Sequence, residues 1–187
     1  MSNISSFSNM LLIAMPAMND PNFRHTVIYV CEHQPEGAVG LIINRPMQFP
    51  ISMIFEQLNI QPNRDQLSTR PLLFGGPTQP ERGFVIHKQL GPWQSSLNLR
   101  EDVTVTTSND IIRAIAVDEG PTDLLVTLGF TGWSAQQLEE EVKNDSWILC
   151  PFKSELLYEV PFEHRWLYAG SLIGIDMNQL TSQSGHA

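Results

Sequence analysis

The sequence predicts a single mixed α/β (α+β) domain, and three observations support this fold class. The 187 residues are 42% hydrophobic and 17% charged, which suits one globular domain with a substantial core. Two apolar runs that flank turn residues predict a β-hairpin over residues 25–44. Residues 103–128 have the pattern of a strand, a helix and a second strand. Because we find no internal repeat or linker, we expect residues 1–187 to form one domain, with flexible ends at 1–9 and 177–187.

The charge balance limits the classes of partner. Twenty acidic residues against eleven basic ones give a net charge of -9 and a pI of about 4.9, so the field of the protein repels phosphate backbones. The sequence has no run of Lys and Arg of the kind that binds nucleic acid. It also has no apolar run of the roughly 18–20 residues that cross a bilayer. We therefore expect a small molecule or a protein as partner, with no direct contact to nucleic acid or membrane.

Cysteine usage indicates a reducing compartment. The two cysteines, Cys31 and Cys150, each lie in an apolar, strand-like run, which predicts buried thiols and not a disulfide framework. The first residues have no basic segment followed by an apolar core and a small-residue cleavage site. We expect a cytoplasmic protein.

The N-terminal third is predicted to consist mainly of strands. Residues 10–15 form a short apolar run, and residues 25–33 are rich in β-branched side chains. Gln34–Gly37 has proline and glycine at the positions that a type I turn prefers, and residues 38–44 return as the second strand of the hairpin. Gly40, inside this strand, marks either a bulge or the close approach of another element.

The middle of the chain alternates helices and strands. Residues 51–58 place their apolar side chains on one side of a short helix, and the polar residues 61–70 predict a surface loop. Strands are expected at 72–74 and 84–87. Ser108 is expected to cap the helix of the βαβ unit, which ends before Gly120-Pro121.

The stretch with the most structural signals lies at residues 124–138. Its apolar strand is expected to stop at Gly129 and Gly132, which tolerate conformations closed to other residues. Ser134 and Gln137 match a capping box, so a helix over 134–143 is expected to start there with free backbone N–H groups. Such a turn can receive an anion. The same turn is also what any βα unit needs to change direction, so both interpretations stay open.

The C-terminal part is predicted to continue this helix, followed by a strand and further helices. Glu139, Glu140 and Glu141 are expected to face water, because consecutive helix positions point about 100° apart and do not converge on a metal ion. Residues 147–150 are expected to form a core strand. Residues 161–169 begin a last helix, with Pro161 near its first position.

Three chemically capable side chains lie within one predicted strand. Strand alternation would place His25, Cys31 and His33 on one face, spaced like metal ligands or like a cysteine nucleophile with its base. The alternative is a buried thiol with histidines at the ends of the strand. Since no zinc-binding, nucleophile-elbow, dinucleotide or Walker motif occurs, we predict neither a metal nor a cofactor and assign no catalytic residue.

A second set of residues suggests ligand binding. They sit at strand ends or glycine turns, where rigid scaffolds usually carry function, and they are Asn44, Arg45, Gly75, Gly76, Gly129, Gly132 and Trp133. If they converge, Arg45 supplies a fork for a carboxylate or phosphate, Trp133 an aromatic wall, and the glycines open backbone N–H groups. In the alternative, Arg45 pairs with a local carboxylate such as Asp20, and each glycine serves a turn.

A series of short motifs spreads along nearly the whole chain: Met15–Met18, Asp20–Phe23, Ala38–Pro46, Phe74–Pro77, Gly83–His87, Leu128–Trp133 and Gln137–Glu139. In this order they resemble the bacterial AlgH/YqgE family, from about Leu11 to Asp176. The resemblance implies a mixed, bifurcated, partly barrel-like sheet surrounded by helices. It does not imply an activity. The family is largely uncharacterised, and its description as a transcriptional regulator comes from one branch and does not imply contact with DNA.

The chain departs from the family pattern at three positions. Phe130 stands where the family usually has tyrosine, which argues against an essential phenol there. Gln136 replaces a glycine, which weakens the idea that the start of the helix lies against a ligand. Thr78 replaces the valine that commonly follows Gly-Gly-Pro.

Together these observations predict a non-enzymatic domain that binds a ligand or a partner, with an indirect regulatory role. One alternative is a hydrolase or redox enzyme that uses Cys31 with a nearby histidine. The other, direct transcriptional regulation, is disfavoured by the net acidity and would require a contiguous basic surface.

Overall fold

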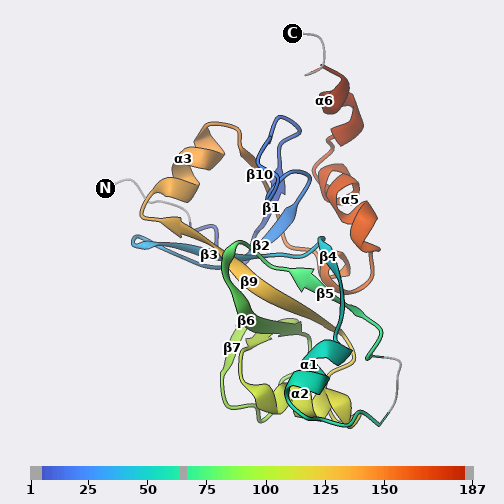
Figure 1. The fold of residues 1–187 in the computed structure, drawn as a ribbon. Coiled ribbons are helices and arrows are strands. Elements are labelled where there is room, and N and C mark those ends of the chain that lie inside the picture. Colours follow the sequence, from blue (N-terminus) through green and yellow to red (C-terminus); the bar gives the residue numbers. More distant parts are fainter. Residues whose placement is uncertain (1–5, 64–66, 184–187) are drawn as a thin grey trace.

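The computed structural model describes residues 6–63 and 67–183. Within them, ten strands form one sheet in the order β10-β1-β2-β3-β9-β6-β8-β7, while β5 pairs with both β9 and β4. Figure 1 shows two sub-sheets that share β9, with helices around them. The predicted mixed, bifurcated and partly barrel-like sheet is therefore confirmed. The strands are β1 (Leu11–Ala14), β2 (Val27–Gln34), β3 (Gly37–Ile42), β4 (Pro46–Pro50), β5 (Pro71–Phe74), β6 (Thr78–His87), β7 (Ser96–Arg100), β8 (Val103–Thr106), β9 (Leu124–Ser134) and β10 (Trp147–Cys150).

The long strand β9 joins the two sub-sheets. Its first half pairs with β5 and β6, and its second half pairs with β3 over residues 131–134. The change of partner falls at Gly129, whose φ of 73° is left-handed and bends the strand. The expectation that the strand stops at Gly129 and Gly132 is wrong, because Gly129 turns the chain within a strand that continues through Gly132 to Ser134.

The predicted hairpin is confirmed as β2 and β3, which pair in antiparallel fashion from Gln34 and Gly37 outward. The pairing skips a residue between Val30 and Glu32, so Cys31 is the extra residue of a β-bulge. Beyond this bulge, the side chains of β2 exchange faces relative to simple alternation.

The βαβ unit is also confirmed. Its strands β8 and β9 both pair antiparallel with β6, which lies between them, so they run in the same direction. Helix α2 (Asn109–Ala116) connects them and buries Ile111, Ile112, Ile115 and Ala116.

Helix α3 (Gln137–Lys143) starts three residues later than predicted. Gln136 adopts the left-handed φ of 65°, and Ser134 makes no cap bond to the helix. Instead the Gln137 side-chain oxygen accepts hydrogen bonds from the Ser134 N–H at 3.0 Å and from its hydroxyl at 3.2 Å. A capping box has two reciprocal hydrogen bonds, and only the one from the Ser134 N–H to the Gln137 side chain forms here. Ser134 is the last residue of β9, so it is not the N-cap of α3.

The helices cover different faces of the sheet (Figure 1). The short α4 (Glu155–Tyr158), the 3-10 helix η1 (Phe162–His164), α5 (Arg165–Leu172) and α6 (Met177–Gln183) pack over the largest core cluster. Helices α1 (Ser52–Gln57) and α2 enclose a second cluster against β5, β6 and β9. A third lies beneath α3, where Trp133 and Trp147 are buried.

Both segments expected to be flexible have defined contacts where the structure describes them. The backbone N–H of Asn9 donates to the Val30 carbonyl at 2.8 Å. At the other end, Met177 in α6 is buried. Residues 1–5 and 184–187 lie outside the described chain. None of the helices in residues 6–63 and 67–183 has the length and apolar character needed to span a membrane.

Candidate functional site

Three of the predicted site segments meet at the kink of β9. The N–H of Gly75 donates to the Leu128 carbonyl at 2.8 Å, and the Gly75 carbonyl accepts from the N–H of Ile42 at 2.9 Å. The Phe74 N–H donates to the Arg45 carbonyl at 2.9 Å. The end of β3, the end of β5 and the bend of β9 are therefore joined through their backbones.

The glycines at this crossing are required by space. A Cβ atom on Gly75 would lie 2.4 Å from the Gly129 carbonyl oxygen, and one on Gly76 would lie 2.2 Å from the Phe130 carbonyl. Gly132 is different: it is exposed, and a Cβ there would meet its nearest neighbour at 3.6 Å. Gly75, Gly76 and Gly129 thus permit the backbone that follows β5 to cross closely over the bend of β9.

Asn44 and Arg45 serve the loop before β2. The Asn44 side chain accepts from the N–H of Val27 at 2.8 Å and donates to the His25 carbonyl at 2.9 Å. The Arg45 guanidinium donates to the carbonyl oxygens of Pro21, Asn22 and Arg24 at 2.8, 2.5 and 2.6 Å. Arg45 therefore holds this turn through the backbone carbonyls of the turn, and not through a carboxylate such as Asp20, as the alternative interpretation had it.

Trp133 is a core residue. It is 6% exposed, and its indole N–H donates to the Glu141 carboxylate at 2.9 Å. The same carboxylate oxygen accepts from the indole N–H of Trp147 at 2.8 Å. Neither Trp133 nor any other residue of the predicted ligand site lines either of the two pockets described below. Their ligand-binding role stays a prediction.

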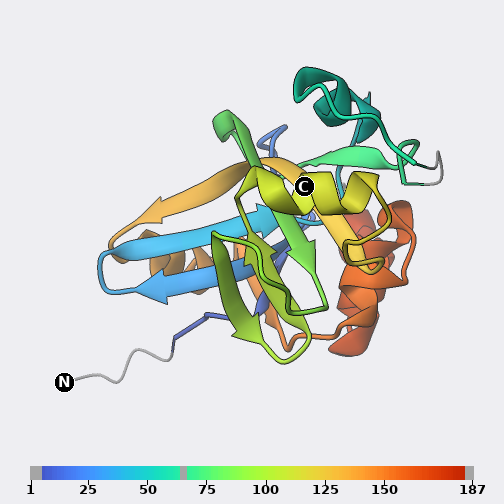
Figure 2. The same cartoon turned by 90° about the horizontal axis from the view of Figure 1, so that it is seen from below.

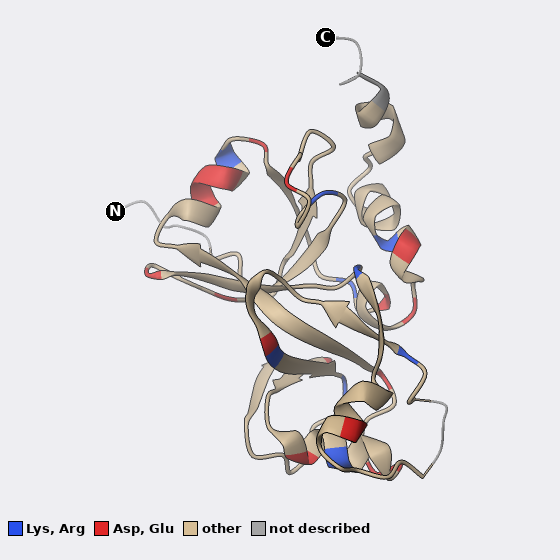
Figure 3. Cartoon of the chain, viewed as in Figure 1, with Lys and Arg blue, Asp and Glu red and all other residues tan. Residues whose placement is uncertain are grey.

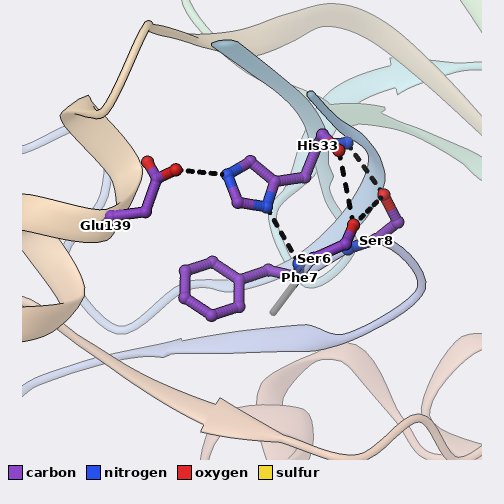
Figure 4. Close-up of polar contacts among 5 residues, drawn as sticks. All are labelled: Ser6, Phe7, Ser8, His33 and Glu139. Carbon is purple, nitrogen blue, oxygen red and sulfur yellow. Dashed lines mark hydrogen bonds and ion pairs between the residues drawn. The ribbon is translucent and has the colours of Figure 1, made fainter. Parts of the chain in front are cut away.

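His33 ties the N-terminal segment to α3 (Figure 4). Its Nδ1 accepts from the Phe7 N–H at 2.9 Å, so the ring proton lies on Nε2, which donates to the Glu139 carboxylate at 2.9 Å. The Phe7 ring stacks on the imidazole at 4.9 Å, and the Ser8 hydroxyl accepts from the His33 N–H at 2.9 Å. The residue has a complete set of structural partners.

The expectation that His25, Cys31 and His33 share one face is wrong. The bulge at Cys31 turns His33 toward α3, while Cys31 packs against the largest core cluster. His25 precedes β2 and has a left-handed φ of 58°. Its ring centroid lies 4.3 Å from that of the Trp166 ring. In the described chain, no group of three or more His, Cys, Asp or Glu side chains is arranged to hold a metal ion.

The structure instead contains a pocket that sequence reasoning missed. We call it the apolar pocket; its volume is about 420 Å³. It lies between the β2–β3 hairpin and the β7–β8 hairpin, which stand side by side in Figure 2, with β6 and β9 contributing its remaining walls. Its apolar lining residues are Val39, Leu41, Phe84, Leu97, Val105 and Phe130, and its polar ones include Glu32, Arg82, Gln94, Ser95, Ser96 and Thr107.

Cys31 also lines the apolar pocket. Desolvation by burial, assisted by the charge of Glu32, raises the pKa of its thiol to about 12. Its polar contact is a long one of 3.9 Å to the Tyr29 carbonyl, and the residues that line the pocket include no histidine. A nucleophilic cysteine requires a lowered pKa or an adjacent base. The described structure provides neither.

Three of the residues that matter here had no local signal in the sequence. Glu139 and Glu141 were expected to face water, but Glu139 binds His33, 106 positions away, and Glu141 binds the two indoles. Of the three glutamates, Glu140 is the exposed one. Phe130 lines the apolar pocket just after the bend of β9 at Gly129, and no local sequence pattern marks this position as part of a pocket.

The Lys and Arg positions are distributed along the chain. Figure 3 shows them on separate elements of the ribbon, several of them beside Asp or Glu. Direct DNA recognition would require a contiguous basic surface.

Comparisons with known proteins agree with the described fold. A family model described as AlgH-like matches residues 11–178. A UPF0301 protein of Legionella pneumophila (strain Lens) is 65% identical over 187 residues, covering 100% of both chains. One from Thioalkalivibrio sulfidiphilus is 42% identical and covers 98% of both.

Solved structures give the same result. The solution structure of the AlgH protein from Pseudomonas aeruginosa superimposes with a TM-score of 0.80 at 39% identity, covering 100% of this chain and 99% of that one. A protein from Corynebacterium diphtheriae has a TM-score of 0.71 at 15% identity, covering 93% of this chain and 91% of that one, and it shows the fold alone. These names specify no ligand and no reaction.

Proposed function

The chain belongs to the AlgH-like family, and we propose that it acts as a non-enzymatic binding domain whose apolar pocket takes a small, mainly apolar molecule. The pocket is the single observation that carries this proposal. Its volume of about 420 Å³ lies within the range of roughly 300–1,000 Å³ typical of small-molecule sites. We place this function in the cytoplasm, where occupancy of the pocket would serve an indirect regulatory role that needs no DNA contact.

The walls of the pocket suit a ligand with an apolar body and a polar end. Phe84 and Phe130 meet edge to face, with ring centroids 5.9 Å apart, on one side of the pocket. The Arg82 guanidinium lies 5.2 Å from the Phe84 ring centroid, so a positive charge stands beside the aromatic wall. Glu32 supplies the opposite charge. Apolar burial would provide affinity, while these two charges would orient the polar end of the ligand.

An exposed leucine supports the same interpretation. Leu97 lines the pocket, yet 54% of its surface is exposed. It belongs to β7, which ends the sheet order. A ligand in the pocket would cover part of this side chain and remove apolar surface from water. The enzymatic alternative receives no comparable support, because Cys31 has neither a base nor a lowered pKa.

The test uses 1-naphthol, a neutral bicyclic probe, and two leucine variants. Leu97→Glu places a charge in the pocket wall. Leu90→Glu is the matched control, because Leu90 is 69% exposed and does not line the pocket. We expect the probe to raise the Tm of the wild type and of Leu90→Glu alike, since a ligand of the native state stabilises it by mass action. In Leu97→Glu the shift should largely disappear.

Methyl NMR spectra locate the probe independently. The resonances of Leu97, Leu41 and Val105 should move, and those of Leu90 should not. An equal Tm shift in Leu97→Glu, or methyl shifts confined to residues outside the pocket, would contradict the proposal.

A further inference from the structure

A second pocket lies at the opposite end of β9, between this strand, the start of β5 and the segment from α4 to η1. Its volume is about 250 Å³. Its lining includes the charged residues Arg70, Asp123 and Arg165 and the aromatic residues Tyr158 and Phe162. We call it the arginine pocket. It shares no lining residue with the apolar pocket.

Arg165 is unusual because it is a cation buried to 3% exposure. Its Nε donates to the Val160 carbonyl at 2.9 Å, its Nη2 to the Leu157 carbonyl at 3.0 Å, and its Nη1 to the Ile43 carbonyl. A guanidinium carries five N–H donors, so these bonds leave donors on the two terminal nitrogens. Its hydrogen-bond acceptors in the described chain are these backbone carbonyls, which are dipoles and carry no net charge.

Within residues 6–63 and 67–183, no carboxylate forms an ion pair with Arg165. Burial lowers the pKa of Arg165 to about 10, and desolvation is the sole cause. The side chain is therefore still charged near neutral pH. A buried charge without a counter-ion is costly, and an anion is the chemical partner that would offset this cost.

Two neighbours prepare the pocket for such an anion. The Arg165 guanidinium carbon lies 4.5 Å from the centroid of the Phe162 ring, a cation–π contact. Arg70 is exposed at the mouth, where its Nη1 donates to the Thr122 carbonyl at 3.3 Å. The acidic lining residue Asp123 lies 4.0 Å from the Lys88 ammonium, so part of its charge is already opposed.

We propose that the arginine pocket binds a small organic carboxylate, with Arg165 as the buried anchor and Arg70 as the second cation at the mouth. A carboxylate matches the planar fork of a guanidinium, and the rings of Tyr158 and Phe162 suit a flat apolar body. The ligand then supplies the counter-ion for the buried Arg165 charge. This site is independent of the apolar pocket, and either proposal can fail without the other.

The experiment titrates the full chain with benzoate, against sodium chloride at equal ionic strength. Benzoate should raise the Tm where chloride does not, and it should shift the Nε–Hε resonance of Arg165. The variant Arg70→Gln should weaken the apparent benzoate affinity about three- to tenfold, as expected for loss of one partly exposed charge contact. Arg113→Gln is the matched control, because Arg113 is exposed on α2 and outside the pocket.

The result does not depend on a variant of Arg165, whose removal would leave three carbonyls without their donor. Equal effects of benzoate and chloride, or an unmoved Arg165 resonance, would overturn the proposal. Inorganic phosphate is titrated in parallel, and a stronger response to phosphate than to benzoate would overturn the carboxylate assignment. An Arg70→Gln variant that binds benzoate like the wild type would show that Arg70 does not contribute to the site, and would overturn the proposal that two arginines bind the ligand.

Discussion

Gly129 and Gly76 cross so closely that a Cβ atom built on Gly129 would lie 2.3 Å from the Gly76 carbonyl oxygen. The opposed carbonyl belongs to the backbone and cannot rotate away as a side chain would. Gly129 also has the left-handed φ of 73°. The crossing lies where β9 changes its partner from β6 to β3, next to Phe130, which lines the apolar pocket.

A glycine series separates space from backbone conformation. Gly129→Ala should cost about 3 kcal/mol or more in unfolding free energy, because it adds a clash to the strain of a left-handed residue. Gly174→Ala should cost only about 1 kcal/mol, since its φ of 74° is left-handed but nothing lies within 4 Å of the new Cβ. Gly132→Ala should stay within about 0.5 kcal/mol. Urea unfolding measures all three; equal losses at Gly129 and Gly174 would show that the crossing is not tight.

The carboxylate of Glu141 is predicted to stabilise the third core cluster. One of its oxygens accepts from both Trp133 and Trp147, and the other accepts from Gln137 at 2.9 Å. Glu141→Ala would leave two buried indole donors unpaired, at about 2–3 kcal/mol in unfolding free energy. Glu140→Ala, at the exposed neighbouring position, should change it by less than about 0.5 kcal/mol. If the two variants unfold at the same urea concentration, the indole bonds contribute nothing.

The thiol of Cys31 should be slow to alkylate, because burial raises its pKa to about 12. In a Cys150→Ala background, iodoacetamide should react with Cys31 at least about a hundredfold more slowly than with free cysteine at pH 7.5, since the thiolate is the reactive form. The rate should rise about tenfold per pH unit from pH 7 to 9 without a plateau. A plateau below pH 8 would indicate an activated thiolate and revive the enzymatic alternative.

Stability should fall on mild acidification, partly through His87. This side chain is completely buried, and desolvation lowers its pKa below the ordinary value of 6.5. Its Nδ1 donates to the Gln89 carbonyl at 2.7 Å, and its Nε2 accepts from the Thr106 hydroxyl at 2.8 Å. Below pH 6.5 the unfolded chain binds a proton that the folded chain does not, so the contribution is complete above that pH and is lost as pH falls.

Urea unfolding at pH 7.5, 6.5 and 5.5 checks this sign. His87→Gln should flatten the decline relative to the wild type. The pKa of His25 is also lowered, by burial and by Arg24 and Arg45. The His87→Gln variant should therefore keep the part of the decline in stability that is due to His25. His164→Gln is the control, because His164 is exposed. A wild type whose stability rises between pH 7.5 and 5.5 would contradict the sign.

Local pattern was enough to predict several elements. The β2–β3 hairpin depends on a turn and on β-branched runs, and the unit from β8 through α2 to β9 depends on periodicity within each element. These signals involve residues that are neighbours in the sequence, so they can be recognised without knowledge of the tertiary structure. The start of α3 was misplaced because Ser134, a good cap residue by type, was taken into β9 by pairing with Gly37.

The sequence by itself determined the family, the mixed fold class and most of the strands, because motifs and apolar periods are local. Only the tertiary structure decided what the polar residues do. A single extra residue at Cys31 reverses the face of His33, and Glu139 reaches that histidine across 106 positions. The two pockets likewise form from residues of separate strands and helices. Such contacts depend on how elements pack in space, for which the order of residues along one element carries no direct signal.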